Sequence, residues 1–286
     1  MDELNMLVLD EQAFLNMPVI DTSIALRVYD IKDTIAVKSK LTKLYGDVGV
    51  LADGKEIALS ALGGERVVTV PAQTDFKKLR YNFSDVMRVI ARLTQKEGGC
   101  PWDKAQTHDS IRINMIEEAY EAVDAIDKRD KENMREEFGD VLLQSVLQSD
   151  IAKRSGEFDF DDVCDELCKK LIGRHTFIFG EDKATNPEEA LGFWEKAKGV
   201  EKHYDTVKTQ LSKLPDNFPA LLLSQKTYKK LKKAGEKIDP NAELDCALEN
   251  KDYAKAIAAC VALLVDEGKD AEVELNGLTK AKIAAL

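Results

Sequence analysis

Acidic side chains gather at helical spacing in the middle of the 286-residue chain. If residues 116–124 form a helix, Glu117, Glu121 and Asp124 lie on one side at positions i, i+4 and i+7. Glu118 lies one step around the same side. An apolar stripe adjoins these acids and consists of Ile116, Ala119, Tyr120, Val123 and Ile126. The acids are therefore expected along the edge of a buried helix face.

A second acidic pair, Glu137 and Asp140, is spaced to lie on one face of the next helix. Magnesium prefers carboxylate oxygens and waters, and it also binds substrate phosphates, so the two helices together would form a cage for one or two ions. The alternative is a solvated acidic face. The E-x-x-D spacing recurs at Glu236/Asp239, Glu249/Asp252 and Glu267/Asp270, whereas E-E-x-x-E occurs once, at Glu117, Glu118 and Glu121. Spacing alone leaves both interpretations open.

Four motifs in and around these acids carry a resemblance to a known family. In chain order they are GGCPWDKAQTH, IEEAYEAVDAI, REEFGDVLLQ and KLIGRHTFIFG, within residues 84–202. Together they resemble the MazG family of nucleoside triphosphate pyrophosphohydrolases. The resemblance implies an all-α helical bundle whose E-E-x-x-E and E-x-x-D carboxylates bind magnesium. It also implies cleavage between the α- and β-phosphates, which gives a nucleoside monophosphate and pyrophosphate.

The resemblance assigns roles to the acids. It implies that Mg²⁺, with Mn²⁺ as a substitute, is held by a set drawn from Glu117, Glu118, Glu121, Glu137 and Asp140. One of the glutamates is expected to orient or deprotonate the attacking water. Two ions would lower the pKa of that water and neutralise charge on the phosphates. Asp124 is left outside this set, as a structural residue or a neighbour of the ligands.

A substrate-binding set follows from the same resemblance. It comprises Lys170, Arg174, Trp194, Lys198, Trp102, Asp103 and Lys104. The cations are expected to contact phosphates, Arg with fixed donor geometry and Lys as a point charge, and Trp194 to lie near the nucleotide. The alternatives are surface cations, a core tryptophan, and a Pro-Trp pair that anchors a loop. His175 is interpreted as structural, because Phe177 stands where the family usually has a second histidine.

Composition narrows the class of protein and its surroundings. Lys and Arg total 41 against 52 Asp and Glu, and the net charge of −11 argues against a general nucleic-acid or anionic-membrane surface. No apolar run approaches the ~18 residues of a membrane span, and the acidic N-terminus lacks the basic region of a signal peptide. The five cysteines form no C-x-x-C pair and are typical of free thiols. A cytoplasmic protein without nucleic-acid or membrane partners is expected.

Residues 1–80 are predicted to form a small α/β domain of β-α-β-β type. A strand at 24–29, a helix at 32–45, a hairpin of 48–52 and 56–61 around Asp53-Gly54, and a strand at 66–70 are expected. The segments LRVYDIKDTIAVKSKLTKLYGD and ALGGERVVTVP resemble the C-terminal part of tetrapyrrole methylases. The front half of that family, with its Gly-rich loops for S-adenosylmethionine, is absent, so a packing or dimerisation module is expected rather than a methyltransferase.

Two helical domains are expected to follow, at 84–204 and 205–286. The first is predicted to begin with a helix capped by Ser84, followed by a loop at 98–109 and by further helices. Those further helices are expected at 109–128, 131–155, 159–174 and 187–202. Short links imply an antiparallel bundle. The second domain resembles a degenerate MazG repeat, since it lacks E-E-x-x-E and carries YAKAIAACVALLV where an acidic helix is expected.

The expected fold class is mainly α, with an all-α bundle preceded by a small α/β unit and followed by the degenerate helical repeat. The expected function is Mg²⁺-dependent hydrolysis of nucleoside triphosphates by a homodimer that clears surplus or noncanonical nucleotides. The alternative is a catalytically silent scaffold or a regulatory nucleotide-binding protein. A di-iron bundle is disfavoured, because no Glu stands three residues before any histidine.

Overall fold

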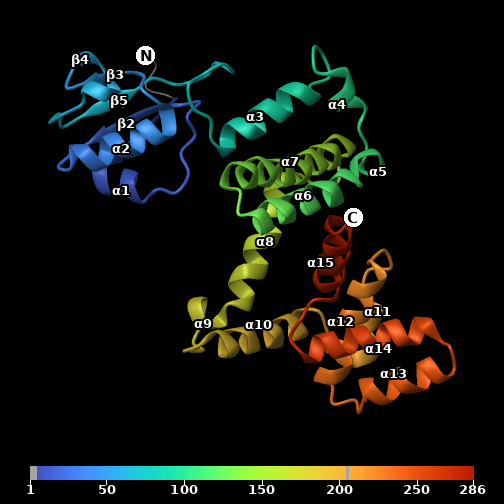
Figure 1. Ribbon diagram of the computed structural model, residues 1–286. Helices are drawn as coiled ribbons and strands as arrows, with labels where there is room; N and C mark the ends of the chain where they lie inside the picture. The colour runs from blue at the N-terminus through green and yellow to red at the C-terminus, as the bar shows by residue number, and fades with distance from the viewer. Residues whose placement is uncertain (1–4, 204–205) are drawn as a thin grey trace. The chain divides into compact units, whose positions relative to one another are not determined.

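The computed structural model describes residues 5–203 and 206–286, which are mainly helical with one small mixed sheet (Figure 1). The mainly α class expected from the sequence is confirmed. Two compact units divide the chain, residues 1–166 and 167–286. The domain boundary expected between residues 204 and 205 lies outside the described residues, and the division into three domains stays a prediction.

A five-stranded sheet opens the first unit, with the strand order β1-β2-β5-β3-β4. β1 pairs with β2 in parallel, and the remaining neighbours are antiparallel. The elements are β1 (Met6–Asp10), α1 (Glu11–Asn16), β2 (Ala25–Tyr29), α2 (Thr34–Tyr45), β3 (Gly49–Ala52), β4 (Lys55–Ala58), the 3₁₀ helix η2 (Leu59–Ala61) and β5 (Val68–Val70). Their apolar faces meet in one core built around Phe14, Leu26, Val37, Leu41 and Val70.

The predicted hairpin around Asp53-Gly54 is confirmed: both residues have positive φ, as the tight turn requires. The expected β-α-β-β pattern was incomplete, because β1 and α1 precede it. Asp10 ends β1 and caps α1 by accepting a hydrogen bond from the backbone N–H of Ala13 at 2.7 Å. The strand expected at 56–61 is also shorter, since Leu59–Ala61 turn into η2.

The first long helix, α3 (Phe83–Thr94), has a different cap from the one predicted. Asn82, not Ser84, is the N-cap, and its side chain exchanges backbone hydrogen bonds with Asp85 in a capping box. Ser84 instead donates its hydroxyl to the Asn82 side chain at 2.7 Å. The asparagine prevails because it precedes the first helical residue, where a side-chain oxygen reaches the free N–H groups.

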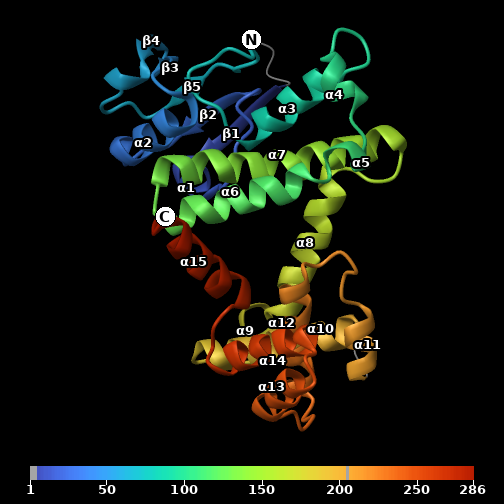
Figure 2. The same ribbon diagram turned by 45° about the vertical axis from the view of Figure 1, so that its right-hand side comes forward.

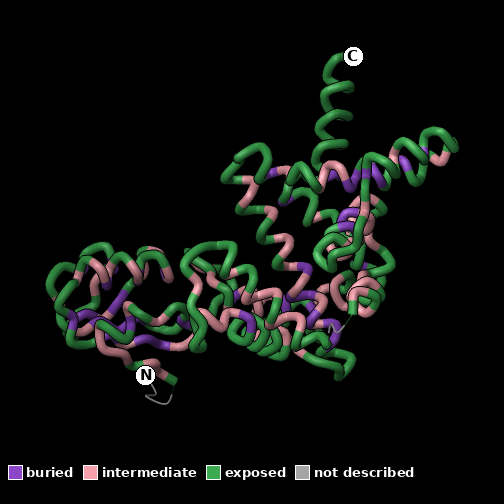
Figure 3. The backbone as a smooth tube through the Cα atoms, turned by 90° about the horizontal axis from the view of Figure 1, so that it is seen from below, coloured by how far each residue is buried: buried purple, intermediate pink, exposed green. Residues whose placement is uncertain are grey.

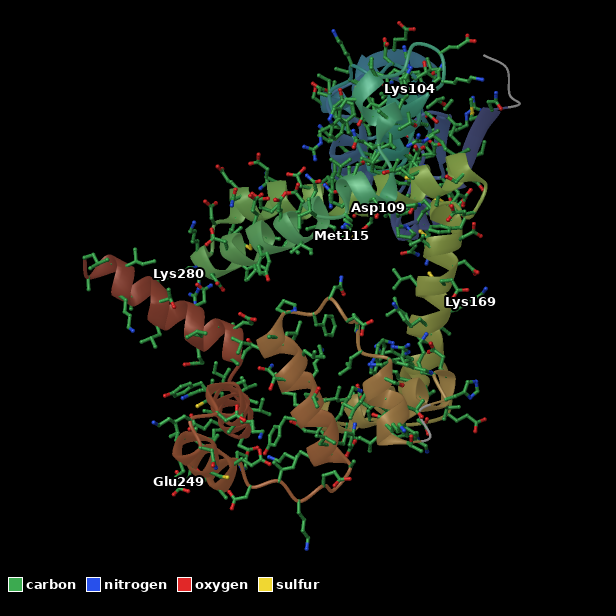
Figure 4. All side chains as sticks on the ribbon, turned by 90° about the vertical axis from the view of Figure 1, so that its right-hand side faces the viewer. Lys104, Asp109, Met115, Lys169, Glu249 and Lys280 are labelled. Atoms are coloured by element: carbon green, nitrogen blue, oxygen red, sulfur yellow. The ribbon has the colours of Figure 1, made fainter. Side chains whose placement is uncertain are left out.

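The segment predicted as a loop at 98–109 contains helical turns (Figure 4). Pro101 begins α4 (Pro101–Ala105), as expected for proline in the first turn of a helix, and Thr107 caps α5 (His108–Ile111). Figure 4 labels Lys104 on α4, Asp109 on α5 and Met115 on the helix that follows. That helix, α6 (Asn114–Lys128), therefore starts later than the predicted Asp109 or Ser110.

A tight helical hairpin carries the acidic motifs (Figure 2). α6 ends at Arg129, which takes a left-handed conformation, and Asp130 caps α7 (Lys131–Ser155). Gly156 ends α7 in the left-handed conformation that glycine adopts without strain. The α7 range is the one predicted from the sequence, and the two-residue connection makes the pair antiparallel.

α3 packs against the C-terminal half of α7. Their shared core consists of Ile90, Ile111, Val146, Leu147 and Ile151. α8 (Phe160–Arg174) joins it through Phe160, whose ring lies 5.4 Å from that of Phe83. This core fixes α7 in place and leaves its N-terminal half to pair with α6.

All the regular secondary-structure elements described in the second unit are helices. It holds the end of α8, α9 (Thr176–Phe179), α10 (Pro187–Glu201), α11 (Val207–Ser212), α12 (Ala220–Lys233), α13 (Pro240–Glu249), α14 (Tyr253–Asp266) and α15 (Ala271–Ala284). α13 and α14 form a hairpin, α12 packs on α14, and Figure 3 shows α15 almost wholly exposed. None of the helices described in either unit is both long and apolar enough to cross a bilayer.

Candidate functional site

Three of the predicted ligands meet on the α6–α7 hairpin. One carboxylate oxygen from each of Glu118, Glu137 and Asp140 lies within 4.8 Å of the others. Glu137 and Asp140 share a face of α7 because they are three residues apart, and the antiparallel partner supplies Glu118. All three side chains are half-buried. The two motifs that the sequence singled out are thus joined by the turn between their helices.

Glu117 and Glu121, the other two predicted ligands, are exposed on α6. Their charges still act on the cluster, since both raise the pKa of Glu118 and Glu121 also raises the pKa of Glu137. They therefore lie beside the three gathered acids rather than among them. Asp124 forms a salt bridge with Lys128 at 2.5 Å, one turn along its own helix.

The electrostatics of the cluster are those of crowded like charges. Partial burial raises the pKa of the Glu118 carboxyl most, followed by the negative charges of Asp140, Glu121 and Glu117. The pKa of Glu137 is raised for the same reasons, again with burial first. The neighbouring charges that raise the pKa values of Glu118 and Glu137 are negative, so a bound cation would offset their repulsion.

A residue that the sequence analysis missed completes this site. Gln144 is 6% exposed, lies one turn after Asp140 on α7, and its side-chain amide acts to lower the pKa of the Glu118 carboxyl. Its Oε1 is buried and has no hydrogen-bond partner among the described residues. The available signal was a single amide in the apolar run VLLQSV, four residues after an acid of the motif.

These donors fit a hard divalent cation. The cluster offers carboxylate oxygens without a thiol or imidazole, which suits Mg²⁺ or Mn²⁺ better than zinc. Mg²⁺ keeps several waters when bound to few carboxylates, and the unpartnered Gln144 oxygen is an acceptor suited to such a water.

The apolar stripe beside the acids is exposed, which corrects the expectation that it is buried. Ile116, Tyr120 and Val123 are 48%, 62% and 52% exposed. The buried residues of α6 are instead Ala122 and Ala125. Small alanines let α6 approach α7 closely, and the larger side chains are left facing outward. The result is an apolar surface adjoining the acidic cluster.

The predicted CPWD residues lie on and near a separate cavity. Trp102 is exposed, and Asp103 and Lys104 are half-buried on α4. Lys104 donates to the backbone carbonyl of Lys96 at 3.2 Å and lines a cavity of about 830 Å³. The described lining comes from α3, α4, α7 and the start of α8, and it does not include the three acids of the cluster.

The remaining predicted substrate residues all belong to the second unit, and Lys170 is exposed one turn before Arg174 on α8. Arg174 is buried and donates two hydrogen bonds to Glu201 of α10, at 2.8 and 3.0 Å. Its guanidinium lies 5.2 Å from the centre of the Trp194 ring. This pairing lowers the pKa of Glu201 to about 2. Lys198 is half-buried on α10.

His175 lies at this second group and makes ordinary packing contacts. Its ring meets Trp194 edge-on, with the centroids 4.8 Å apart, and its Nδ1 lies 2.6 Å from the carbonyl of Leu171. His108, which the sequence left uninterpreted, contacts the side chain of Gln148. These partners are what a structural histidine requires.

Fold and site together define a helical hairpin with a candidate carboxylate metal centre. Residues 106–179 match the profile of the MazG nucleotide pyrophosphohydrolase domain. The matched segment holds the hairpin and all three acids of the cluster.

Relatives of this chain carry the same region. A nucleoside triphosphate pyrophosphohydrolase of Escherichia coli is 37% identical over 150 residues, which is 52% of this chain and 57% of that protein. The nucleoside triphosphate pyrophosphohydrolase/pyrophosphatase MazG of Thermotoga maritima is 35% identical over 153 residues, 54% of this chain and 58% of its own. The chain thus spans little more than half the length of these relatives. A crystal structure of a mazG-related protein from Thermotoga maritima is 27% identical with a TM-score of 0.36, covering 40% of this chain and 97% of that one.

Proposed function

We propose that the protein is a Mg²⁺-dependent nucleoside triphosphate pyrophosphohydrolase. The observation that carries the proposal is the convergence of Glu118, Glu137 and Asp140 inside the MazG match, where neighbouring acids raise the pKa values of Glu118 and Glu137. Relatives named for this activity share the region at 35–37% identity. The products would be a nucleoside monophosphate and pyrophosphate, and the biological role would be clearance of surplus or noncanonical nucleotides.

In the proposed mechanism the three gathered acids would hold Mg²⁺, with Mn²⁺ as a substitute. When bound, the ion would neutralise charge on the phosphates and lower the pKa of a water. Water would add to one phosphorus of the α–β anhydride, the bridging P–O bond would break, and the nucleoside monophosphate and pyrophosphate would separate. Glu117 and Glu121, exposed beside the cluster, are the candidates to orient this water and accept its proton.

Substrate binding is proposed for the seven residues assigned by resemblance. Arg174 is the best prepared of these, because its guanidinium is held against Trp194 in a fork geometry suited to phosphate. Phosphate would have to displace Glu201 from it. Lys170, Lys198 and Lys104 would add point charges, and Trp102 and Asp103 would lie near the nucleotide.

A homodimer is proposed on the exposed apolar surface of α6. Large apolar side chains stand outward on this helix and on the facing part of α7; they are Ile113, Met115, Ile116, Tyr120, Val123, Ile126, Phe138 and Leu142. A contiguous surface of this kind is typical of an interface. A second copy of the chain would cover it and shield the acids. Tyr120→Asp should give a monomer by analytical ultracentrifugation, whereas Leu191→Asp on α10 should not.

The N-terminal module, whose sequence resembles the C-terminal part of tetrapyrrole methylases, is proposed as a packing unit. Its attachment to α3 through buried polar groups supports this role. None of the five cysteines, all within the described residues, forms a disulfide, which suits the proposed cytoplasmic location.

The activity is tested by measuring pyrophosphate release from a panel of ribo- and deoxynucleoside triphosphates, with Mg²⁺ and with EDTA. We expect release from at least one nucleotide that depends on the metal. Folded protein that is silent across the panel would instead support a regulatory or scaffold role.

A further inference from the structure

Gln144 has a place in the site that packing alone does not explain. It follows Asp140 by one turn of α7, so its side chain lies on the face that carries the acids. The residue is more than nine-tenths buried, while the acids beside it are half-buried. A polar amide at such a position is expected to have all its hydrogen bonds made.

The orientation of the amide follows from its neighbour. A carboxylate only accepts hydrogen bonds, so the part of the Gln144 amide that faces Glu118 and lowers its pKa is the Nε2 donor. The Oε1 atom then points away from the Glu118 oxygens. It is buried without a partner among the described residues, which leaves its acceptor capacity available to a donor such as a bound water.

We propose that Gln144 is a positioning residue of the metal site: its Nε2 holds Glu118, and its Oε1 accepts a hydrogen bond from a water that accompanies the cation. The inference rests on the proposed metal site and adds a residue to it. Carboxylates that bind metals are commonly held by such neighbours, whose loss weakens metal affinity or activity about 10- to 100-fold. Mg²⁺ brings waters with it, since it is dehydrated reluctantly.

The chain offers a matched control one turn further on. Gln148 is a half-buried glutamine of α7 whose side chain contacts His108, away from the three acids. Gln144→Met and Gln148→Met remove the same amide and keep a side chain of similar length. Thermal unfolding of each variant in EDTA, followed by circular dichroism, shows whether the variant is folded. If Gln144→Met does not fold, Gln144→Leu replaces it.

The first measurement is Mg²⁺ and Mn²⁺ binding by isothermal titration calorimetry without nucleotide. We expect affinity to fall about 10- to 100-fold in Gln144→Met. In Gln148→Met it should stay within about twofold of the wild type. Equal affinity in wild type and Gln144→Met overturns the inference, and so does a wild-type protein that binds neither ion.

The second measurement separates a role in metal binding from general damage. Pyrophosphate release by Gln144→Met should recover as Mg²⁺ is raised to saturation, with the KM for nucleotide close to that of the wild type. Loss that persists at saturating Mg²⁺ would show a defect other than metal positioning. Metal binding is measured without nucleotide, so the two proposals can fail separately. A wild type that binds Mg²⁺ but releases no pyrophosphate would refute the proposed activity. The role of Gln144 would then be judged on metal affinity alone.

Discussion

Two clusters of charged side chains in the first unit differ in how their charges are balanced. Near the base of α3, Lys78 and Asp85 form a salt bridge at 2.6 Å, with side chains only 5% and 4% exposed. Thr22 accepts a hydrogen bond from Lys78 at 2.7 Å, and Arg88 approaches Asp85 at 3.4 Å. Each charge in this cluster has an opposite charge or a hydrogen bond from the chain itself.

The cluster on the α6–α7 hairpin lacks that balance. Neighbouring acids raise the pKa values of Glu118 and Glu137, and the Oε1 of Gln144 has no hydrogen-bond partner in the part of the chain that the structure describes. The buried pair ties the N-terminal module to α3, because Asp85 is also part of the cap of that helix. The same folded chain thus neutralises one charged cluster with its own side chains and leaves another with negative charge that a cation would neutralise. The comparison gives four predictions.

The largest effect is expected from Asp140→Asn in the unbalanced cluster. Losing a ligand should reduce pyrophosphate release by more than the roughly 100-fold that removal of a ligand's neighbour can cost. The metal-free variant should be at least as stable as the wild type, since one repelling charge is gone. Enzyme assays and thermal unfolding in EDTA check both parts. An exposed acid of the same helix, Glu132→Gln, is the control, and wild-type rates in Asp140→Asn would remove this residue from the site.

In the cluster of Lys78 and Asp85, replacing the acid by its amide should lower the free energy of unfolding. Asp85→Asn keeps an acceptor for the cap but leaves Lys78 buried without its partner, which typically costs about 3–5 kcal/mol. Urea unfolding measures the loss, and Mg²⁺ affinity of the folded variant should not change. The double variant Lys78→Met/Asp85→Asn should recover part of the stability. A loss below about 1 kcal/mol would mean that the pair does not hold the module in place.

The acidic cluster on the α6–α7 hairpin also predicts how the stability of the protein depends on pH. The pKa values of Glu118 and Glu137 are raised in the metal-free fold, so the folded state binds protons more readily than the unfolded chain. Stability from these groups is therefore present at low pH and is lost as pH rises through their folded-state pKa values. With Mg²⁺ bound, stability should instead rise with pH, because protons compete with the ion for the carboxylates. The Tm difference between Mg²⁺ and EDTA should shrink from pH 7.5 to pH 5, and a constant difference would contradict the site.

The smallest effect is expected from Asp124→Asn. This acid is paired with Lys128 on its own helix at a partly exposed position, where such pairs contribute about 0.3–0.5 kcal/mol. Stability should fall by no more than this, and the rate of pyrophosphate release should stay within about twofold. A loss comparable to that of Asp140→Asn would place Asp124 among the ligands.

Much of the local structure could be predicted from the sequence. The bounds of α7 followed from Asp130 and Gly156, which are strong start and stop signals, and the Asp53-Gly54 turn followed from its dipeptide. β1 was missed because its partner, β2, lies fifteen or more residues along the chain and its short apolar run has no local signal of its own. Strand pairing depends on contacts that no local pattern reports.

The candidate site was predicted in outline and refined by packing. The sequence offered five acids at helical spacing, and the structure gathers Glu118, Glu137 and Asp140 while Glu117 and Glu121 stand outside. That choice depends on how α6 is rotated against α7, which the buried alanines set. The same rotation exposes Tyr120, which the periodicity had assigned to a buried face.

The sequence by itself determined the helices, their caps, and the three-residue spacing that puts Glu137 and Asp140 on one face. These follow from backbone geometry and nearby side chains, which act within a few residues. Only the tertiary structure decided that Glu118 joins them, that Gln144 is buried with an acceptor that no described residue pairs, and that Lys78 meets Asp85. Such facts depend on which surfaces of distant segments pack together, because burial and pairing are properties of the contact and not of either segment.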